Sequence, residues 1–109
     1  MLVVTHERTS QVKRVKIDLL HSQYENFTMH DNDSIDDMVK RFTKITNGLV
    51  SLVDAINNDQ KVRKVIRGLP PSWKVKATTL KELNDKEEME LISLIENLKT
   101  NEMERKARE

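Results

Sequence analysis

Residues 62–73 of this 109-residue chain read VRKVIRGLPPSW, and this stretch decides the fold. Its apolar residues recur at the three- and four-residue spacing of one helix face; they are Val62, Val65, Ile66 and Leu69. Pro70 lacks a backbone donor and pushes the residue before it out of the α region, so this helix must stop. Pro71 and Ser72 suit the start of a new helix, which places the only tryptophan at the corner. The stretch therefore predicts an architectural elbow between two helices, formed by Leu69, Pro70, Pro71 and Trp73.

The rest of the chain favours an all-α domain. The whole chain has only two glycines and two prolines, and the alternation typical of strands is almost absent. The clearest helical pattern covers residues 35–52, with apolar residues at Ile35, Met38, Val39, Phe42, Ile45, Leu49 and Leu52. Ser34 is the expected N-cap of this helix. The segment that begins at Asn57 is expected to cap the start of the next helix, which runs to the elbow.

Three more helices complete an expected compact bundle of about five. The first should begin at Thr9 or Ser10, with residues 1–7 as the stub of an earlier helix; its apolar stripe is Val12, Val15, Leu19, Leu20 and Tyr24. The fourth should follow Ser72, and the fifth should end near residue 104, before a charged and frayed tail at 105–109. The core is predicted to contain Leu19, Tyr24, Met38, Phe42, Ile45, Val62, Val65, Leu94 and Leu98.

Composition limits the classes of function. Without cysteine, disulfides and thiolate chemistry are excluded. No apolar run approaches the roughly 20 residues of a membrane span, and residues 1–4 are too short for a signal peptide. We expect a cytoplasmic protein with no membrane partner.

No set of residues predicts a reaction site. The three histidines match no zinc-binding spacing; they are His6, His21 and His30. Residues 31–33 resemble the opening of a calcium loop, but Asp36 stands where that loop requires glycine. The two glycines are isolated, so no glycine-rich loop can bind a phosphate. The chain is predicted not to be an enzyme and to use no metal, cofactor or small-molecule substrate.

Charge is unevenly distributed although the net charge is only +1. Residues 61–81 hold seven Lys/Arg and no Asp/Glu, whereas residues 31–60 and 82–109 are net acidic. One interpretation is that these residues form solvated outer faces of helices. The other is a contact with a second copy, in which the basic block 61–81 meets an acidic face at 31–37 or 82–104. The candidate contacts, with protein or with RNA, are Lys61, Arg63, Lys64, Arg67, Lys74 and Lys76.

Trp73 lies beside two of these lysines, which also suggests base stacking on a single strand. Stacking platforms usually combine several aromatic residues, so we favour the elbow role.

The whole chain resembles the gag polypeptide of copia-type LTR retrotransposons of plants. The resemblance is carried by residues 9–13 (TSQVK), 19–20 (LL), 24–25 (YE), 36–38 (DDM), 41–42 (RF), 45 (I), 62–67 (VRKVIR), 69–70 (LP), 72–73 (SW), 94–95 (LI), 98–99 (LK) and 102–103 (EM). Arg8 and Val53 depart from it, because the family tends to have a glycine and a Leu-Gly turn there.

The resemblance implies a retroviral-capsid-like helical domain over residues 1–104, which self-associates into particles that package the element's RNA. It implies other Gag copies as partners. RNA is a further implied partner, although this chain lacks the Cys/His zinc knuckle that follows the region in such polyproteins. The alternatives are an RNA-binding helical module that uses the basic block, and a domesticated Gag fragment that serves as a protein-interaction adaptor.

Overall fold

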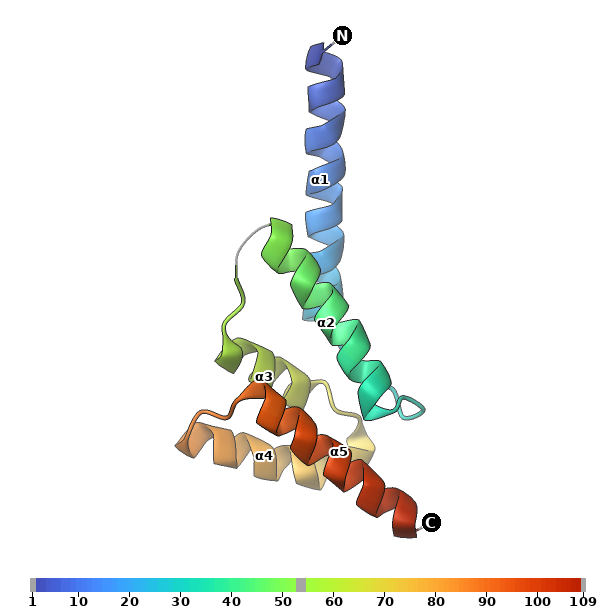
Figure 1. Ribbon diagram of the computed structural model, residues 1–109, viewed down its shortest axis with the longest axis vertical. Coiled ribbons are helices and arrows are strands. Elements are labelled where there is room, and N and C mark those ends of the chain that lie inside the picture. Colours follow the sequence, from blue (N-terminus) through green and yellow to red (C-terminus); the bar gives the residue numbers. More distant parts are fainter. Residues whose placement is uncertain (1, 53–54, 109) are drawn as a thin grey trace.

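The computed structural model describes residues 2–52 and 55–108, with side chains from residue 11 onward. Its elements are α1 (Leu2–Glu25), α2 (Ile35–Leu52), α3 (Asn58–Arg67), the single 3₁₀ turn η1 (Pro71–Trp73), α4 (Lys74–Lys86) and α5 (Leu91–Arg108). All regular elements within the described residues are helical, which confirms the predicted all-α fold with five helices. Figure 1 shows α3, α4 and α5 packed at one end, with α2 leading from them to the lower part of α1. The molecule measures 63 × 31 × 19 Å.

Helix α1 differs from its prediction at the N-terminal end. Thr9 and Ser10 lie inside the helix and not at its start, and residues 2–7 belong to the same helix. The physical reason is that no glycine or proline interrupts residues 2–25, so nothing stops the helix at Thr9. Two positions depart from the family resemblance, Arg8 and Val53. The side chain of Arg8 and the whole of Val53 lie outside the described part of the structure.

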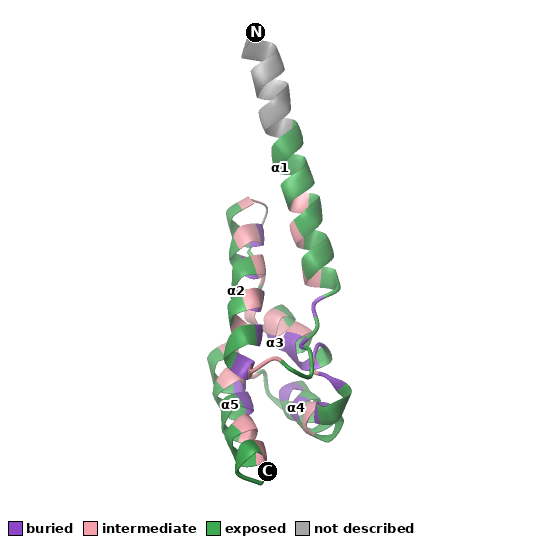
Figure 2. Cartoon of the chain, turned by 90° about the vertical axis from the view of Figure 1, so that its right-hand side faces the viewer, coloured by how far each residue is buried: buried purple, intermediate pink, exposed green. Residues whose placement is uncertain are grey.

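The predicted burial of Leu19 is wrong, since 56% of this residue is exposed. Only one side of α1 packs on α2, and that side carries Leu20 and Tyr24. Gly48 of α2 lets the Leu20 side chain approach closely, because a Cβ there would lie 2.9 Å from Leu20 Cδ1. Leu19 lies on an exposed side of the helix, and Figure 2 shows mostly exposed residues along the part of α1 that is coloured by burial.

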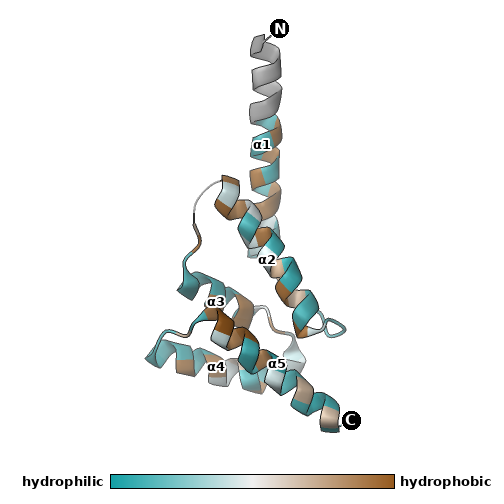
Figure 3. Ribbon diagram, in the orientation of Figure 1, coloured by the Kyte–Doolittle hydropathy of each residue, from teal (hydrophilic) through white to brown (hydrophobic). Residues whose placement is uncertain are grey.

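The core lies where α2, α3, α4 and α5 meet. The other predicted core residues all belong to it, with Tyr24 and Ile45 half-buried and the remainder buried: Met38, Phe42, Val62, Val65, Leu94 and Leu98. Phe27, just after α1, adds an edge-to-face contact with its ring centroid 5.0 Å from that of Phe42. Figure 3 shows the hydrophobic start of α5 lying beside α3.

Side-chain caps fix two helix starts as predicted. The Ser34 hydroxyl accepts the Asp37 N–H at 3.1 Å in the first turn of α2. At α3, the Asn57 side chain accepts the Gln60 N–H at 2.8 Å while the Gln60 side chain accepts the Asn57 N–H at 3.2 Å. These bonds satisfy donors that a helix cannot pair internally.

The elbow has its predicted form, with one added turn. The Trp73 N–H donates to the Pro70 carbonyl at 2.8 Å, so a 3₁₀ turn precedes α4, where a helix directly after Ser72 was expected. Trp73 is only 5% exposed. Its ring lies against the guanidinium of Arg105, which leaves little of the ring for base stacking. The structure therefore supports the architectural interpretation of Trp73.

Helix α5 was expected to end near residue 104, but it continues through residues 105–108. Arg105 lies over the Trp73 ring with its guanidinium carbon 4.3 Å from the ring centroid, and it also donates to the Ser72 carbonyl. These contacts give the last turns of α5 a partner in the elbow, which explains why the helix continues.

Candidate assembly surface

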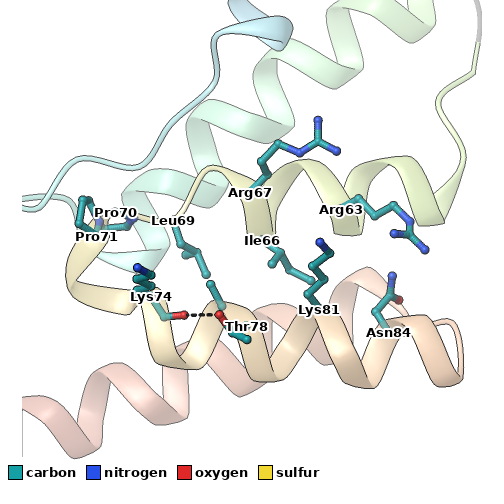
Figure 4. A pocket seen from close by; sticks show the side chains of 11 residues that line it. Arg63, Ile66, Arg67, Leu69, Pro70, Pro71, Lys74, Thr78, Lys81 and Asn84 are labelled. Atoms are coloured by element: carbon teal, nitrogen blue, oxygen red, sulfur yellow. Dashed lines mark hydrogen bonds between the residues drawn. The ribbon is translucent and has the colours of Figure 1, made fainter.

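A groove runs between α3 and α4 and reaches the elbow (Figure 4). Its volume is about 450 Å³. Its floor is apolar and is formed by Ile66, Leu69, Pro70, Pro71 and Ala77. Ile66 points from α3 toward α4, and Lys81 reaches up from α4 beside it. Three of the four elbow residues therefore also help to form a concave surface, whereas Trp73 is buried and does not line the groove.

Four cationic side chains line this groove, and no carboxylate does. We call them the basic rim: Arg63, Arg67, Lys74 and Lys81. Of these, only Arg63 forms an ion pair with a residue in the described part of the chain. Arg67, Lys74 and Lys81 are exposed, and none of them forms an ion pair with a residue in the described ranges, 2–52 and 55–108. The groove thus joins an apolar floor to a positive margin.

Arg63 holds the far end of the groove in shape. Its Nε donates to Asp59 at 2.8 Å and its Nη1 lies 3.2 Å from Asp85, which ties α3 to α4. The buried Asn84 side chain also donates to Asp59, at 3.2 Å. Hydrogen bonds from Arg63 and Asn84 lower the pKa of Asp59, and the bond to Asp59 raises the pKa of Arg63. At this end of the groove, the charge of Arg63 is compensated by Asp59 and Asp85, and the three lining cations without an ion pair are the other members of the basic rim.

The structure separates the six cations predicted as contacts. Arg63, Arg67 and Lys74 line the groove, whereas Lys61, Lys64 and Lys76 do not. Lys64 is drawn toward α1, with its ammonium 4.8 Å from the Tyr24 ring centroid and 3.8 Å from the Glu25 carboxylate. The six-residue prediction omitted Lys81. Its spacing from Lys74, seven residues or two helical turns, places the two on one face and is the signal that identifies it.

Two of the four aspartates of the acidic face at 31–37 form ion pairs within the same molecule. Asp33 pairs with Arg41, and Asp36 lies 2.9 Å from the Lys99 ammonium. The hydrogen bond from Lys99 lowers the pKa of Asp36. These pairs connect α2 to its preceding loop and to α5, so their charges are already compensated.

The acidic face at 82–104 keeps more of its charge free. Glu102 accepts the Ile35 N–H at 2.8 Å and thereby caps α2. Glu90 and Glu96 are exposed and have no ion-pair partner among the described residues. Ile92, between them, is 68% exposed. We call Glu90, Ile92 and Glu96 the acidic edge.

The described residues form neither a metal site nor a membrane-spanning helix. His21 and His30 are exposed, and within the described residues no three His, Asp or Glu side chains gather as metal ligands would. The side chain of His6 lies outside the described part. Among the helices described, none has the length and apolar character needed to span a bilayer.

Comparison with known proteins gives one family. The model described as gag-polypeptide of LTR copia-type matches residues 1–109. No curated protein and no solved structure matches the chain.

Proposed function

The chain belongs to the gag-polypeptide family of copia-type LTR elements, and from this we propose that it is a capsid-like structural protein that self-associates. In this proposal, copies assemble in the cytoplasm into particles that package the element's RNA. The observation that carries it is the family match over all 109 residues. An enzymatic role is not part of the proposal, because the family is structural.

The groove supports self-association as the mode of action. An apolar floor beside uncompensated charge is the kind of surface that another protein covers, because apolar burial supplies affinity and charge supplies orientation. The second, distinct surface that an assembling copy needs is available at the acidic edge of α5.

The alternative, an RNA-binding helical module, is favoured by the same three free cations of the basic rim. Phosphate contacts made by Arg67, Lys74 and Lys81 would bind RNA without self-association. Their affinity would fall by about 0.7 log units per log unit of salt for each phosphate contacted.

Electron microscopy of the purified full chain, with and without single-stranded RNA, tests the proposal. We expect particles of defined size whose RNA is protected from nuclease. Single molecules in every grid, with RNA bound to them in a strongly salt-dependent way, would establish the RNA-binding module in its place. Single molecules that bind no RNA would leave the adaptor interpretation.

A further inference from the structure

We propose that the groove between α3 and α4 receives the acidic edge of a second copy, in a head-to-tail contact. Ile92 enters over the apolar floor, and the carboxylates of Glu90 and Glu96 meet the basic rim. This inference rests on the proposed function, because it names the surfaces through which copies associate.

The groove lacks the negative partners that its charge requires. Arg67, Lys74 and Lys81 are exposed around an apolar floor and have no ion pair with any described residue. A partner of matching chemistry must present an apolar side chain with carboxylates next to it.

The acidic edge has that chemistry in this same sequence. Ile92 and Glu96 are four residues apart on α5 and therefore share one face of the helix. Glu90 directly precedes α5. Ile92 is 68% exposed, and Glu96, one turn later on the same face, has no ion-pair partner among the described residues, so this edge offers an apolar side chain beside a free carboxylate.

Two other surfaces of a second copy fit the groove less well. On the acidic face at 31–37, Asp33 and Asp36 are already paired with cations of their own chain, and the apolar Ile35 between them is fully buried. The exposed stripe of Val12, Val15 and Leu19 on α1 is apolar, but Lys13 and Lys16 beside it would repel the basic rim. Charge complementarity therefore disfavours this stripe and agrees with a contact at the acidic edge.

The geometry of such a contact has a consequence for assembly. The groove is formed by α3, the elbow and α4, whereas the acidic edge belongs to α5 and the residue before it. Because the two surfaces are different, a contact between them is heterologous and generates rings or open arrays, not a closed pair. This is the kind of contact that a particle needs.

Reciprocal charge reversal in the full chain tests the contact. One variant carries Lys74→Glu and Lys81→Glu, and the other carries Glu90→Lys and Glu96→Lys. Matched controls make the same charge changes elsewhere: Lys16→Glu with Lys44→Glu, and Asp18→Lys with Glu104→Lys. Circular dichroism and the midpoint of thermal unfolding verify that every variant is folded. The readout is the distribution of assembled species in sedimentation velocity.

We expect each reversed variant alone to self-associate at least about tenfold more weakly than the natural chain, because like charges then meet. An equimolar mixture of the two should assemble again, since the acidic groove of one meets the basic edge of the other. The control variants should assemble like the natural chain.

Other outcomes separate the two proposals. If the natural chain assembles and neither reversal weakens it, or if the mixture is not restored, this inference is overturned and the proposed function stands. Loss of assembly in the groove variant alone, with RNA needed for assembly of the natural chain, would assign the groove to RNA and also overturn the inference. A natural chain that never assembles contradicts both proposals.

Discussion

The guanidinium carbon of Arg105 lies 4.3 Å from the centroid of the Trp73 ring, and the same side chain donates to the carbonyl of Ser72. This pair joins the end of α5 to the elbow between α3 and α4. Through it, the C-terminal helix holds the corner that forms one end of the groove.

Replacement of Arg105 by alanine should lower the free energy of unfolding by about 1–2 kcal/mol, the sum expected for a partly buried cation–π contact and one hydrogen bond. Urea unfolding followed by Trp73 fluorescence measures the change. Arg108→Ala, at an exposed position of the same helix, is the control and should change little. Equal effects at both positions would mean that the Trp73 contact contributes nothing to stability.

Two leucines of α4 offer a matched test of the core. Leu80 is fully buried, whereas Leu83 is 48% exposed. Leu80→Ala should cost about 2–5 kcal/mol, because it leaves a cavity among packed side chains. Leu83→Ala should cost less than about 1 kcal/mol. Denaturant unfolding measures the free energy of unfolding of both variants. A larger loss for Leu83→Ala than for Leu80→Ala would show that α4 packs through its other face.

The two glycines should respond differently to alanine. At Gly68 an added Cβ would lie 3.0 Å from the Phe27 carbonyl oxygen, which is backbone and cannot easily move. We expect Gly68→Ala to destabilise the protein by about 1–3 kcal/mol through overpacking. At Gly48 the nearest atoms are the flexible end of Leu20, and alanine gains roughly 0.8–1.0 kcal/mol of helix propensity. Gly48→Ala should therefore be close to neutral, and thermal unfolding of the two variants compares them directly.

Stability should fall in acid because three aspartates have lowered pKa values. Hydrogen bonding to the His30 N–H lowers the pKa of Asp33; hydrogen bonds from Lys99 and Arg63 do so for Asp36 and Asp59. A carboxyl with a lower pKa in the folded state stabilises it fully above the unfolded value of about 3.9, and this contribution is lost as pH falls through the folded value.

Urea unfolding at neutral pH and below pH 4 should show that loss. NMR titration of the Asp59 carboxyl in the natural chain and in Arg63→Gln attributes part of this loss to one residue. Without the Arg63 hydrogen bond, the pKa of Asp59 should return toward its ordinary value. A titration of Asp59 that Arg63→Gln leaves unchanged would contradict the role of this ion pair.

Local signals in the sequence predicted much of the fold. The spacing of apolar residues predicted α2 and α3, and Ser34 and Asn57 marked their starts because a cap involves only neighbouring residues. Pro70 predicted the corner for the same reason. The start of α1 was missed because Thr9 and Ser10 are good caps that also tolerate a helix interior. Leu19 was misplaced because the described part of α1 carries apolar residues on two sides, and α2 packs on the side of Leu20 and Tyr24.

The candidate site was less predictable, because it depends on contacts between distant residues. The basic block was visible as a run of charge, yet only the packing of α3 against α4 places Arg67, Lys74 and Lys81 around one groove. Arg105 gave no signal, since residues 105–109 are nearly all charged and its partner Trp73 lies 32 positions earlier. The ion pair of Asp36 depends on Lys99 of α5, which no local pattern indicates.

Sedimentation velocity of the natural chain over a wide concentration series shows whether copies self-associate through complementary charge. The measurement should be made at about 0.1 M and about 1 M salt, where the screening lengths are about 10 Å and 3 Å. We predict species larger than the monomer that increase with concentration and decrease at the higher salt. A single monomer boundary at every concentration, or assembly that is indifferent to salt, would show that copies do not associate through complementary charge.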